Sequence, residues 1–198
     1  MGDSIVRENL QMPSDPSASL RGRLLVAAPP LADANFDRSV VLMLEHGEDG
    51  SLGLVLNRPT ATVLDEVLPD WRDVASAPAV VFVGGPVSRD AVIALARGGT
   101  DVDEGWVPLL DDLGTVDVGR DPALLRDGVR ALRVFVGYAG WEARQLQAEL
   151  DQGAWFVVDA LPSDPFVSDP SALWSDVLRR QPGRLSIFAL CPEDPSVN

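Results

Sequence analysis

The chain has few of the side chains that most enzymes use. Its 198 residues contain one histidine, His46, and one cysteine, Cys191. All 16 basic residues are arginine, which excludes Schiff-base chemistry and a P-loop lysine. One histidine and one cysteine are also too few for an ordinary zinc site. The single cysteine cannot form an internal disulfide, and we interpret it as a small, buried apolar residue.

Two further absences bear on location and partners. The sequence has no run of eighteen apolar residues, and its first twenty residues lack an apolar segment behind a basic start. We therefore expect a cytoplasmic protein without a membrane span. The formal net charge of −14 argues against direct nucleic-acid binding, because such binding depends on neutralising phosphates with Lys and Arg.

Length and composition predict one globular domain. With 198 residues and 46% hydrophobic content, the chain is long enough to bury a core and short enough to be a single unit. Residues 1–20 combine low hydrophobicity with Ser, Pro and Asp, and they show no periodicity. We expect a disordered N-terminal lead over 1–20 and a single domain over 21–198.

Short apolar runs predict strands. The runs are "RLLVAAP", "SVVLMLEH" and "LGLVLN", and the last two predict a β-hairpin over 39–57 whose turn contains Gly47, Asp49 and Gly50. Weaker strand signals lie at 106–110 and 115–118. A further strand is expected at 155–159, and "RLSIFAL" predicts a closing strand over 184–190.

Glycine turns and capping residues predict helices. Two strands, 79–83 and 132–136, are each followed by glycines and then by an expected helix. The predicted helices are 63–68 capped by Thr62, 89–96 capped by Ser88, 141–150, a short helix opened by Asp121 and Pro122, and one opened by Asp169 and Pro170. Strands outnumber helices, and hairpins are mixed with βαβ-like segments. We therefore expect an α+β domain with a curved, mostly antiparallel sheet and helices outside it.

The hairpin turn carries the only candidate acid and base residues that lie close together. A serine or cysteine nucleophile would have to recruit His46, and no G-x-S-x-G elbow supplies the serine. Glu45 and Asp49 leave a carboxylate-based cation site open, although no EF-hand spacing indicates one. The alternative is a purely structural turn in which His46 makes hydrogen bonds at a strand end.

The two glycine turns offer a second candidate site. Gly84, Gly85 and Gly140 would let a ligand approach backbone N–H groups at the start of the expected helices, which is anion-binding geometry in principle. Neither turn has the Rossmann or Walker A spacing, so a tight strand-to-helix connection is the alternative. Tyr138 and Trp141 flank Gly140, and they either stack on a ligand ring or staple a helix to the core.

Several stretches taken together resemble the bacterial YqgE/AlgH family. The matching segments, which extend from about Leu24 to Leu178, are "LLVAAPPLADANFDRSVVLMLEHGEDGSLGLVLNRP", "VFVGGPVSRD", "VFVGYAGWEARQLQAEL", "GAWFV" and "PFVSDPSALWSDVL". The resemblance implies an α+β fold with a bifurcated, barrel-like sheet and no established enzyme activity. Some members carry the label of transcriptional regulator of alginate synthesis, which makes a DNA-linked role an alternative for this chain.

Two departures from the family narrow the chemistry. Family members commonly have a Leu-His pair after Gly-Gly-Pro and a Gly-His-Ala ending, where this chain has "DAVIALARGG" and "FALCPEDPSVN". Only His46 remains, so a mechanism that uses the other histidines is excluded. The family-like residues shape a surface rather than a catalytic set, because most of them are glycines, aromatics, Asn57 and Arg58.

Our leading hypothesis is a non-enzymatic module that binds an unknown small molecule or protein partner, with no cofactor or metal. The expected binding residues border a cleft between the glycine turns and 57–59, and they are Asn57, Arg58, Gly84, Gly85, Tyr138, Gly140 and Trp141. The alternatives are the DNA-linked regulator and a hydrolase or metal-dependent enzyme centred on Glu45, His46 and Asp49.

Overall fold

A computed structural model describes residues 19–29, 33–98, 105–120 and 128–191. Most of the expected disordered lead lies outside these residues, but Leu20 at its end is buried in the core. The short helix expected at Asp121 and Pro122 also lies outside the described residues.

Ten strands form one sheet within the described residues. They are β1 (Arg23–Ala27), β2 (Val40–Gly47), β3 (Gly50–Val55), β4 (Pro59–Val63), β5 (Val80–Val83), β6 (Val87–Gly98), β7 (Trp106–Leu110), β8 (Leu113–Val116), β9 (Val129–Glu142) and β10 (Trp155–Asp159). The helical segments are α1 (Leu64–Val67), η1 (Pro69–Val74), α3 (Gln145–Asp151), η3 (Asp164–Phe166), α4 (Leu173–Arg179) and α5 (Leu185–Phe188), where η marks a 3₁₀ turn.

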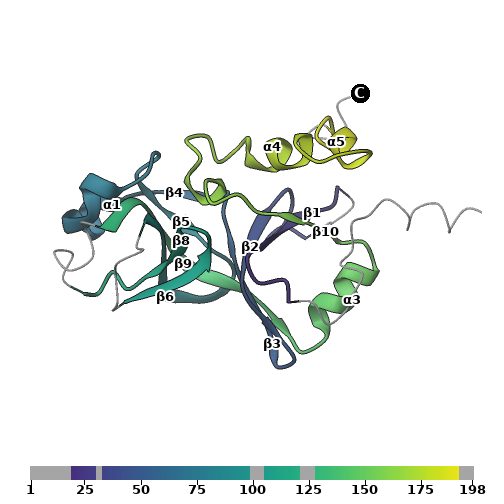
Figure 1. Ribbon diagram of the computed structural model, residues 1–198, viewed down its shortest axis with the longest axis horizontal. Helices are drawn as coiled ribbons and strands as arrows, with labels where there is room; N and C mark the ends of the chain where they lie inside the picture. Colours follow the sequence, from purple (N-terminus) through teal and green to yellow (C-terminus); the bar gives the residue numbers. More distant parts are fainter. Residues whose placement is uncertain (1–18, 30–32, 99–104, 121–127, 192–198) are drawn as a thin grey trace, which may run out of the picture.

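The sheet is curved and divides at β9. Its main order is β10-β1-β2-β3-β9-β6-β8-β7, and β4 pairs with β5, which runs parallel to β9. The first part of β9 pairs with β5 and β6, whereas its last residues pair with β3. Figure 1 shows the consequence, with β4 to β9 gathered beside α1 and with β1 and β10 on the other side near α3. The predicted α+β fold with a bifurcated, mostly antiparallel sheet is confirmed.

The two faces of the sheet pack against different helices. Side chains alternate along a strand, so Leu42 and Leu44 join one core cluster while Val41 and Met43 join another. The first cluster includes the buried face of α4, which runs across the top of Figure 1, and the second includes the buried face of α3. The strands β4 to β9 curve into a half-barrel, and a third cluster lies around Trp71 within it.

Much of the local prediction holds. The β2–β3 hairpin forms with Gly47 opposite Gly50, and strands occupy the expected positions near 24, 80, 106, 132 and 155. Strand β8, at Leu113–Val116, only partly overlaps the strand expected at 115–118. The helix predicted to open at Asp169 and Pro170 forms as α4, although it begins at Leu173 with Ala172 at its N-cap. Its buried residues are Leu173, Trp174, Val177 and Leu178. Cys191 is half-buried and packs against the first core cluster.

The helix predicted after Gly84 and Gly85 is wrong. Residues 87–98 form β6, which pairs with β9 through contacts such as Ala94 with Val134. Ser88 is not a helix cap, because its φ of 44° lies in the left-handed region where the β6 register shifts. Pairing with distant strands therefore determines the structure here, although the sequence has a capping residue and a glycine stop typical of a helix.

The second predicted unit is also different. Gly137 to Gly140 lie inside β9 rather than in a turn, and the helix begins at Gln145 instead of Trp141. Arg144, with φ 66°, supplies the change of direction between strand and helix.

Two smaller predictions are wrong as well. The helix predicted over 63–68 forms as the single turn α1, but Thr62 does not cap it, because Thr62 belongs to β4 and Val63 is at the N-cap with no side-chain cap. The predicted closing strand over 184–190 is α5, because this segment packs on α4 and its Phe188 stacks on Phe156 at 5.2 Å between ring centroids.

Candidate functional site

Asn57 and Arg58 serve the fold. The Asn57 side chain is buried, its Oδ1 accepts the Val40 N–H at 3.1 Å, and its Nδ2 donates to the Arg38 carbonyl at 2.9 Å. Arg58 donates to the backbone carbonyls of Asp37 and Asn57. Burial lowers the pKa of Arg58, and the charge of Asp37 partly opposes that effect. Both side chains therefore tie the loop before β2 to the end of β3.

Gly84 and Gly85 pack directly against the backbone of β9 at Gly137 and Tyr138, so there is no cleft between these two segments. A Cβ on Gly84 would lie 2.4 Å from the Gly137 carbonyl oxygen, and a Cβ on Gly85 would lie 2.2 Å from the Tyr138 carbonyl carbon. The Gly84 N–H donates to the Val136 carbonyl at 2.8 Å. No helix follows either glycine pair directly, so the proposed helix N-terminal anion site has no structural basis.

A groove on the sheet unites residues from both candidate sites. We call it the Tyr138 groove, and its volume is about 650 Å³. It is lined by Glu45, Asp49, Gly50, Ser51, Leu52, Val87, Tyr138, Gly140, Trp141, Glu142 and Gln145. Three of the seven predicted binding residues and two of the three alternative enzyme residues therefore border one hollow.

The pleat of β9 divides these residues between two faces. Tyr138 packs with Leu52 on the first core cluster, whereas Trp141 joins the second. The indole N–H groups of Trp141 and Trp155 both donate to Glu149 Oε2, at 2.9 and 2.8 Å. Trp141 therefore anchors α3, and its side chain is not free to stack on a ligand.

Gly140 forms an open part of the groove. A Cβ at this position would lie 3.4 Å from Tyr138 Cε2 and 3.6 Å from Val87 Cγ2, both ordinary contact distances. Its φ is not in the left-handed region, so an L side chain fits the backbone. The missing side chain leaves room beside the ring of Tyr138.

The groove is electronegative. Glu45, Asp49 and Glu142 are exposed, and none of them makes an ion pair with any residue that the structure describes. Like charges on one rim repel each other, and a cation held between them relieves that repulsion. The arrangement therefore favours positively charged ligands.

His46 has a partner that sequence reasoning missed. Its Nδ1 lies 2.8 Å from Ser51 Oγ, because the hairpin register places the two residues opposite each other. Burial lowers the pKa of His46, which favours the neutral imidazole. Glu45 precedes His46 in the strand and so projects to the opposite face. A two-residue turn between Gly47 and Gly50 was the signal that could have identified Ser51.

Metal ligands do not gather in the described part of the chain. Across residues 19–29, 33–98, 105–120 and 128–191, no group of three His, Cys, Asp or Glu side chains could hold a metal ion.

Buried and clustered arginines were also missed. The guanidinium of Arg133 donates to the carbonyls of Val167 and Ala77 and lies 4.4 Å from the Phe82 ring centroid. Burial lowers the pKa of Arg133 to about 10. This side chain links two loops to the middle of β9, and no carboxylate among the described residues pairs with it.

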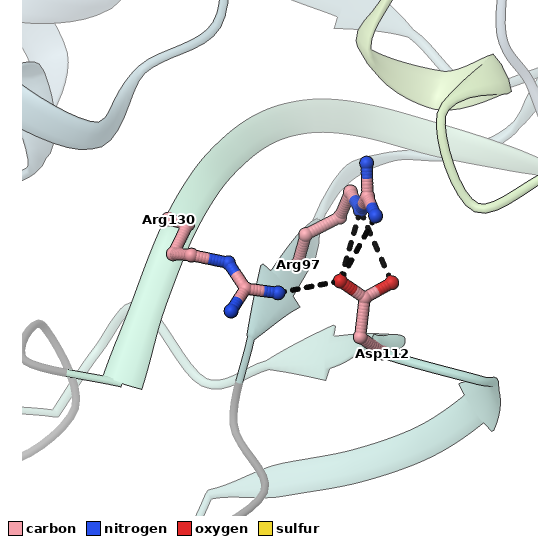
Figure 2. Close-up of polar contacts among 3 residues, drawn as sticks. All are labelled: Arg97, Asp112 and Arg130. Atoms are coloured by element: carbon pink, nitrogen blue, oxygen red, sulfur yellow. Dashed lines mark hydrogen bonds and ion pairs between the residues drawn. The ribbon is translucent and has the colours of Figure 1, made fainter.

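Two other arginines, Arg97 and Arg130, share one carboxylate at the far end of the sheet. Asp112 accepts hydrogen bonds from Arg97 and Arg130, as Figure 2 shows, and the shortest is 2.7 Å from Arg130 Nη2. The three residues come from β6, the β7–β8 turn and the start of β9. The cluster holds three strand ends together.

An apolar hollow lies elsewhere in the half-barrel. It has a volume of about 580 Å³ and is lined mainly by valines, of which Val67 and Val92 are 52% and 53% exposed. A third pocket has a volume of about 500 Å³ and shares Glu45 and Leu52 with the Tyr138 groove. It shares Val92, Val116 and Asp117 with the apolar hollow. Sequence reasoning missed these pockets because it placed a helix where β6 runs.

Comparison with known proteins identifies the family. The AlgH-like family model (DUF179) matches residues 24–186. The chain belongs to the AlgH-like family. A UPF0301 protein from Streptomyces coelicolor is 50% identical over 186 residues, covering 91% of this chain and 96% of that protein. A UPF0301 protein from Mycobacterium leprae is 45% identical over 181 residues, covering 89% of this chain and 90% of that protein.

Solved structures of family members share the fold. A crystal structure of a protein from Corynebacterium diphtheriae is 33% identical with a TM-score of 0.79, over 89% of this chain and 93% of that one. The solution structure of AlgH from Pseudomonas aeruginosa is 31% identical with a TM-score of 0.66, over 92% and 100%. The family resemblance is therefore confirmed, and the function of this UPF0301 family is uncharacterised. None of the described helices is long and apolar enough to span a membrane.

Proposed function

We propose that this chain is a non-enzymatic binding module that holds a positively charged partner in the Tyr138 groove. The observation that carries the proposal is the groove itself, which is lined by the exposed carboxylates Glu45, Asp49 and Glu142 and by the half-buried ring of Tyr138. A guanidinium over a tyrosine ring gains about 0.5–1 kcal/mol at an exposed site, and more when water is excluded. Carboxylates on the same rim add Coulomb attraction that salt weakens.

The single tyrosine provides a direct test. In protein labelled with ¹³C-tyrosine, the only ring signals come from Tyr138. Titration with agmatine, a small guanidinium compound, should shift these signals in a saturable way at low salt. A neutral amide of similar length should not shift them. Ring signals that do not respond up to millimolar agmatine would refute the proposal.

Charge variants separate the groove from the protein as a whole. Changing both Glu45 and Glu142 to Gln should weaken agmatine binding about fivefold, because each exposed carboxylate adds about 0.5 kcal/mol. The matched control is Glu66→Gln, which removes an exposed charge from α1 outside the groove. Equal weakening by the control would assign the effect to net charge alone.

One observation favours a second candidate, a serine hydrolase. Ser51 Oγ and His46 Nδ1 are 2.8 Å apart, which is the distance expected between a nucleophile and its base. Incubation with a fluorophosphonate should then label Ser51, and His46→Gln should abolish the labelling. Unlabelled wild-type protein would dispose of this candidate.

The DNA-linked role that the family label implies has less support. A net charge of −14 repels phosphates, and a groove lined by carboxylates adds no phosphate contact. Gel shifts over a salt series test this role, because true phosphate contacts lose affinity steeply as salt rises.

A further inference from the structure

The backbone of β9 has an open hydrogen-bonding edge inside the Tyr138 groove. The register pairs Gly50 with Glu142 and Leu52 with Gly140. The Glu142 N–H donates to Gln145 Oε1 at 3.0 Å, so it does not point at β3. Because hydrogen-bonded and non-bonded pairs alternate along an antiparallel ladder, the N–H and C=O of Gly140 also point away from β3.

Gly137 explains why this edge is open. Its φ of 69° interrupts the regular alternation of side chains between the two faces of β9. Phe135 and Tyr138, which are three residues apart, therefore pack on the same core cluster. On the side away from β3, the last contact between β6 and β9 joins Val87 to Tyr138. Beyond that pair, no described strand lies beside Gly140 on this side, and no turn or loop backbone bond among the described residues involves it.

We propose that the groove takes an extended peptide segment, which adds a short antiparallel strand along β9 opposite Gly140. This inference rests on the proposed function and names the partner as a peptide with a basic residue. One peptide residue exchanges two backbone hydrogen bonds with Gly140, as edge-strand addition requires. The protein itself makes one bond of this kind two residues further along β9. There the Glu142 N–H donates to the side-chain oxygen of Gln145, which lies where a carbonyl oxygen of an added strand would lie.

The groove also specifies the side chain of that residue. In an antiparallel pair, directly opposite residues project to the same face. The peptide residue opposite Gly140 therefore projects toward Tyr138 and Glu142, whose side chains share that face of β9. Glu45 borders the same hollow, and Gly140 has no side chain to block it. An arginine or lysine at this position satisfies the exposed carboxylates.

The experiment compares three probes by fluorescence anisotropy and calorimetry. The first is the end-blocked peptide Thr-Val-Arg-Val-Thr, the second is the same peptide methylated on the arginine backbone nitrogen, and the third is agmatine. The first peptide should bind about tenfold tighter than the methylated one, because methylation removes one of the two backbone bonds and hinders the other. Replacing the arginine by glutamate should abolish binding.

The outcomes separate the two proposals. If both peptides and agmatine bind equally, the groove recognises a cation and the added strand is refuted. If none of them binds, the proposed function fails as well. Binding by the unmodified peptide that exceeds binding by both other probes supports the strand.

Protein variants locate the binding. Gly140→Val should abolish peptide binding while the protein stays folded, because the valine fills the groove and suits an extended strand. The matched control, Gly47→Val, places the same side chain in open space outside the groove and should leave affinity unchanged. Circular dichroism and thermal melting check the fold of both variants. Unchanged affinity in a folded Gly140→Val protein would overturn the inference.

Discussion

Asp112 offers the sharpest test of how the sheet is held at its far end. Its carboxylate receives Arg97 Nε at 3.1 Å, Arg97 Nη2 at 3.0 Å and Arg130 Nη2 at 2.7 Å (Figure 2). The side chain of Asp112 is 21% exposed, that of Arg97 36% and that of Arg130 70%. The two-point contact with Arg97 is therefore better protected from solvent than the contact with Arg130.

These contacts determine how much stability the protein should lose when Asp112 is replaced. A charge-assisted pair contributes about 1.5–3 kcal/mol when buried and about 0–1 kcal/mol when exposed. Asp112→Asn should therefore lower the free energy of unfolding by about 1–2 kcal/mol at pH 7. In double-mutant cycles, the coupling of Asp112 to Arg97 should be near 1 kcal/mol, and its coupling to Arg130 should be smaller.

The effect should depend on pH in one direction. The hydrogen bonds from Arg97 hold the pKa of Asp112 below its usual value, those from Arg130 add to the effect, and burial partly opposes it. A carboxyl with a lowered folded-state pKa stabilises the protein fully above its unfolded-state pKa of about 3.9. This stabilisation is lost as the pH falls through the folded-state pKa. The difference between wild type and Asp112→Asn should thus be constant from pH 7 to 5 and shrink toward pH 3.

Urea unfolding of both proteins across this pH range provides the assay. Asp111→Asn is the control, since it makes the same charge change at the neighbouring position without touching either arginine. Asparagine also tolerates the φ of 49° at that position. If both variants have the same stability at every pH, the cluster contributes nothing and the reasoning is refuted.

Three other changes should affect stability, and each is measured by urea unfolding. Asn57→Ala should cost about 2–3 kcal/mol, because it leaves two backbone groups without partners; a loss below about 0.5 kcal/mol would contradict this role. Glu149→Ala should cost about 2–3 kcal/mol and alter tryptophan fluorescence, because two buried indole N–H groups lose their acceptor. Gly84→Ala should cost more than about 2 kcal/mol, because its Cβ meets a carbonyl at 2.4 Å; native stability would show that the backbones separate easily.

The sequence predicted those elements whose signals are local. The β2–β3 hairpin follows from two apolar runs broken by Gly47 and Gly50, and α4 follows from apolar residues at helical spacing. Strand β6 could not be predicted in this way, because Ser88 and the run after it satisfy the local rules for a helix. Its strand conformation comes from pairing with β9, forty residues or so further along the chain.

The sequence named several residues of the Tyr138 groove, but it did not give their arrangement. Tyr138, Gly140, Glu45 and Asp49 do border one groove. Asn57 was assigned to binding because it is one of the family-like residues that shape a surface, yet its amide bonds the backbone of Arg38 and Val40. Whether a polar side chain is already bonded depends on distant backbone, and sequence spacing does not show that.

Two glycines of β9 differ in why they are glycine: the backbone requires Gly137, whereas it does not require Gly140. Gly137 has a left-handed φ, and a Cβ there would lie 2.6 Å from the Gly85 carbonyl oxygen, so the fold alone requires glycine. Gly140 has neither constraint, since its φ is ordinary and its nearest contact would be 3.4 Å. Glycine inside a strand costs up to about 1 kcal/mol relative to residues that favour strands. Gly140→Ala should therefore leave stability equal or slightly higher and weaken binding of the arginine peptide. If Gly140→Ala destabilised the protein, glycine at this position would be required for folding rather than for binding.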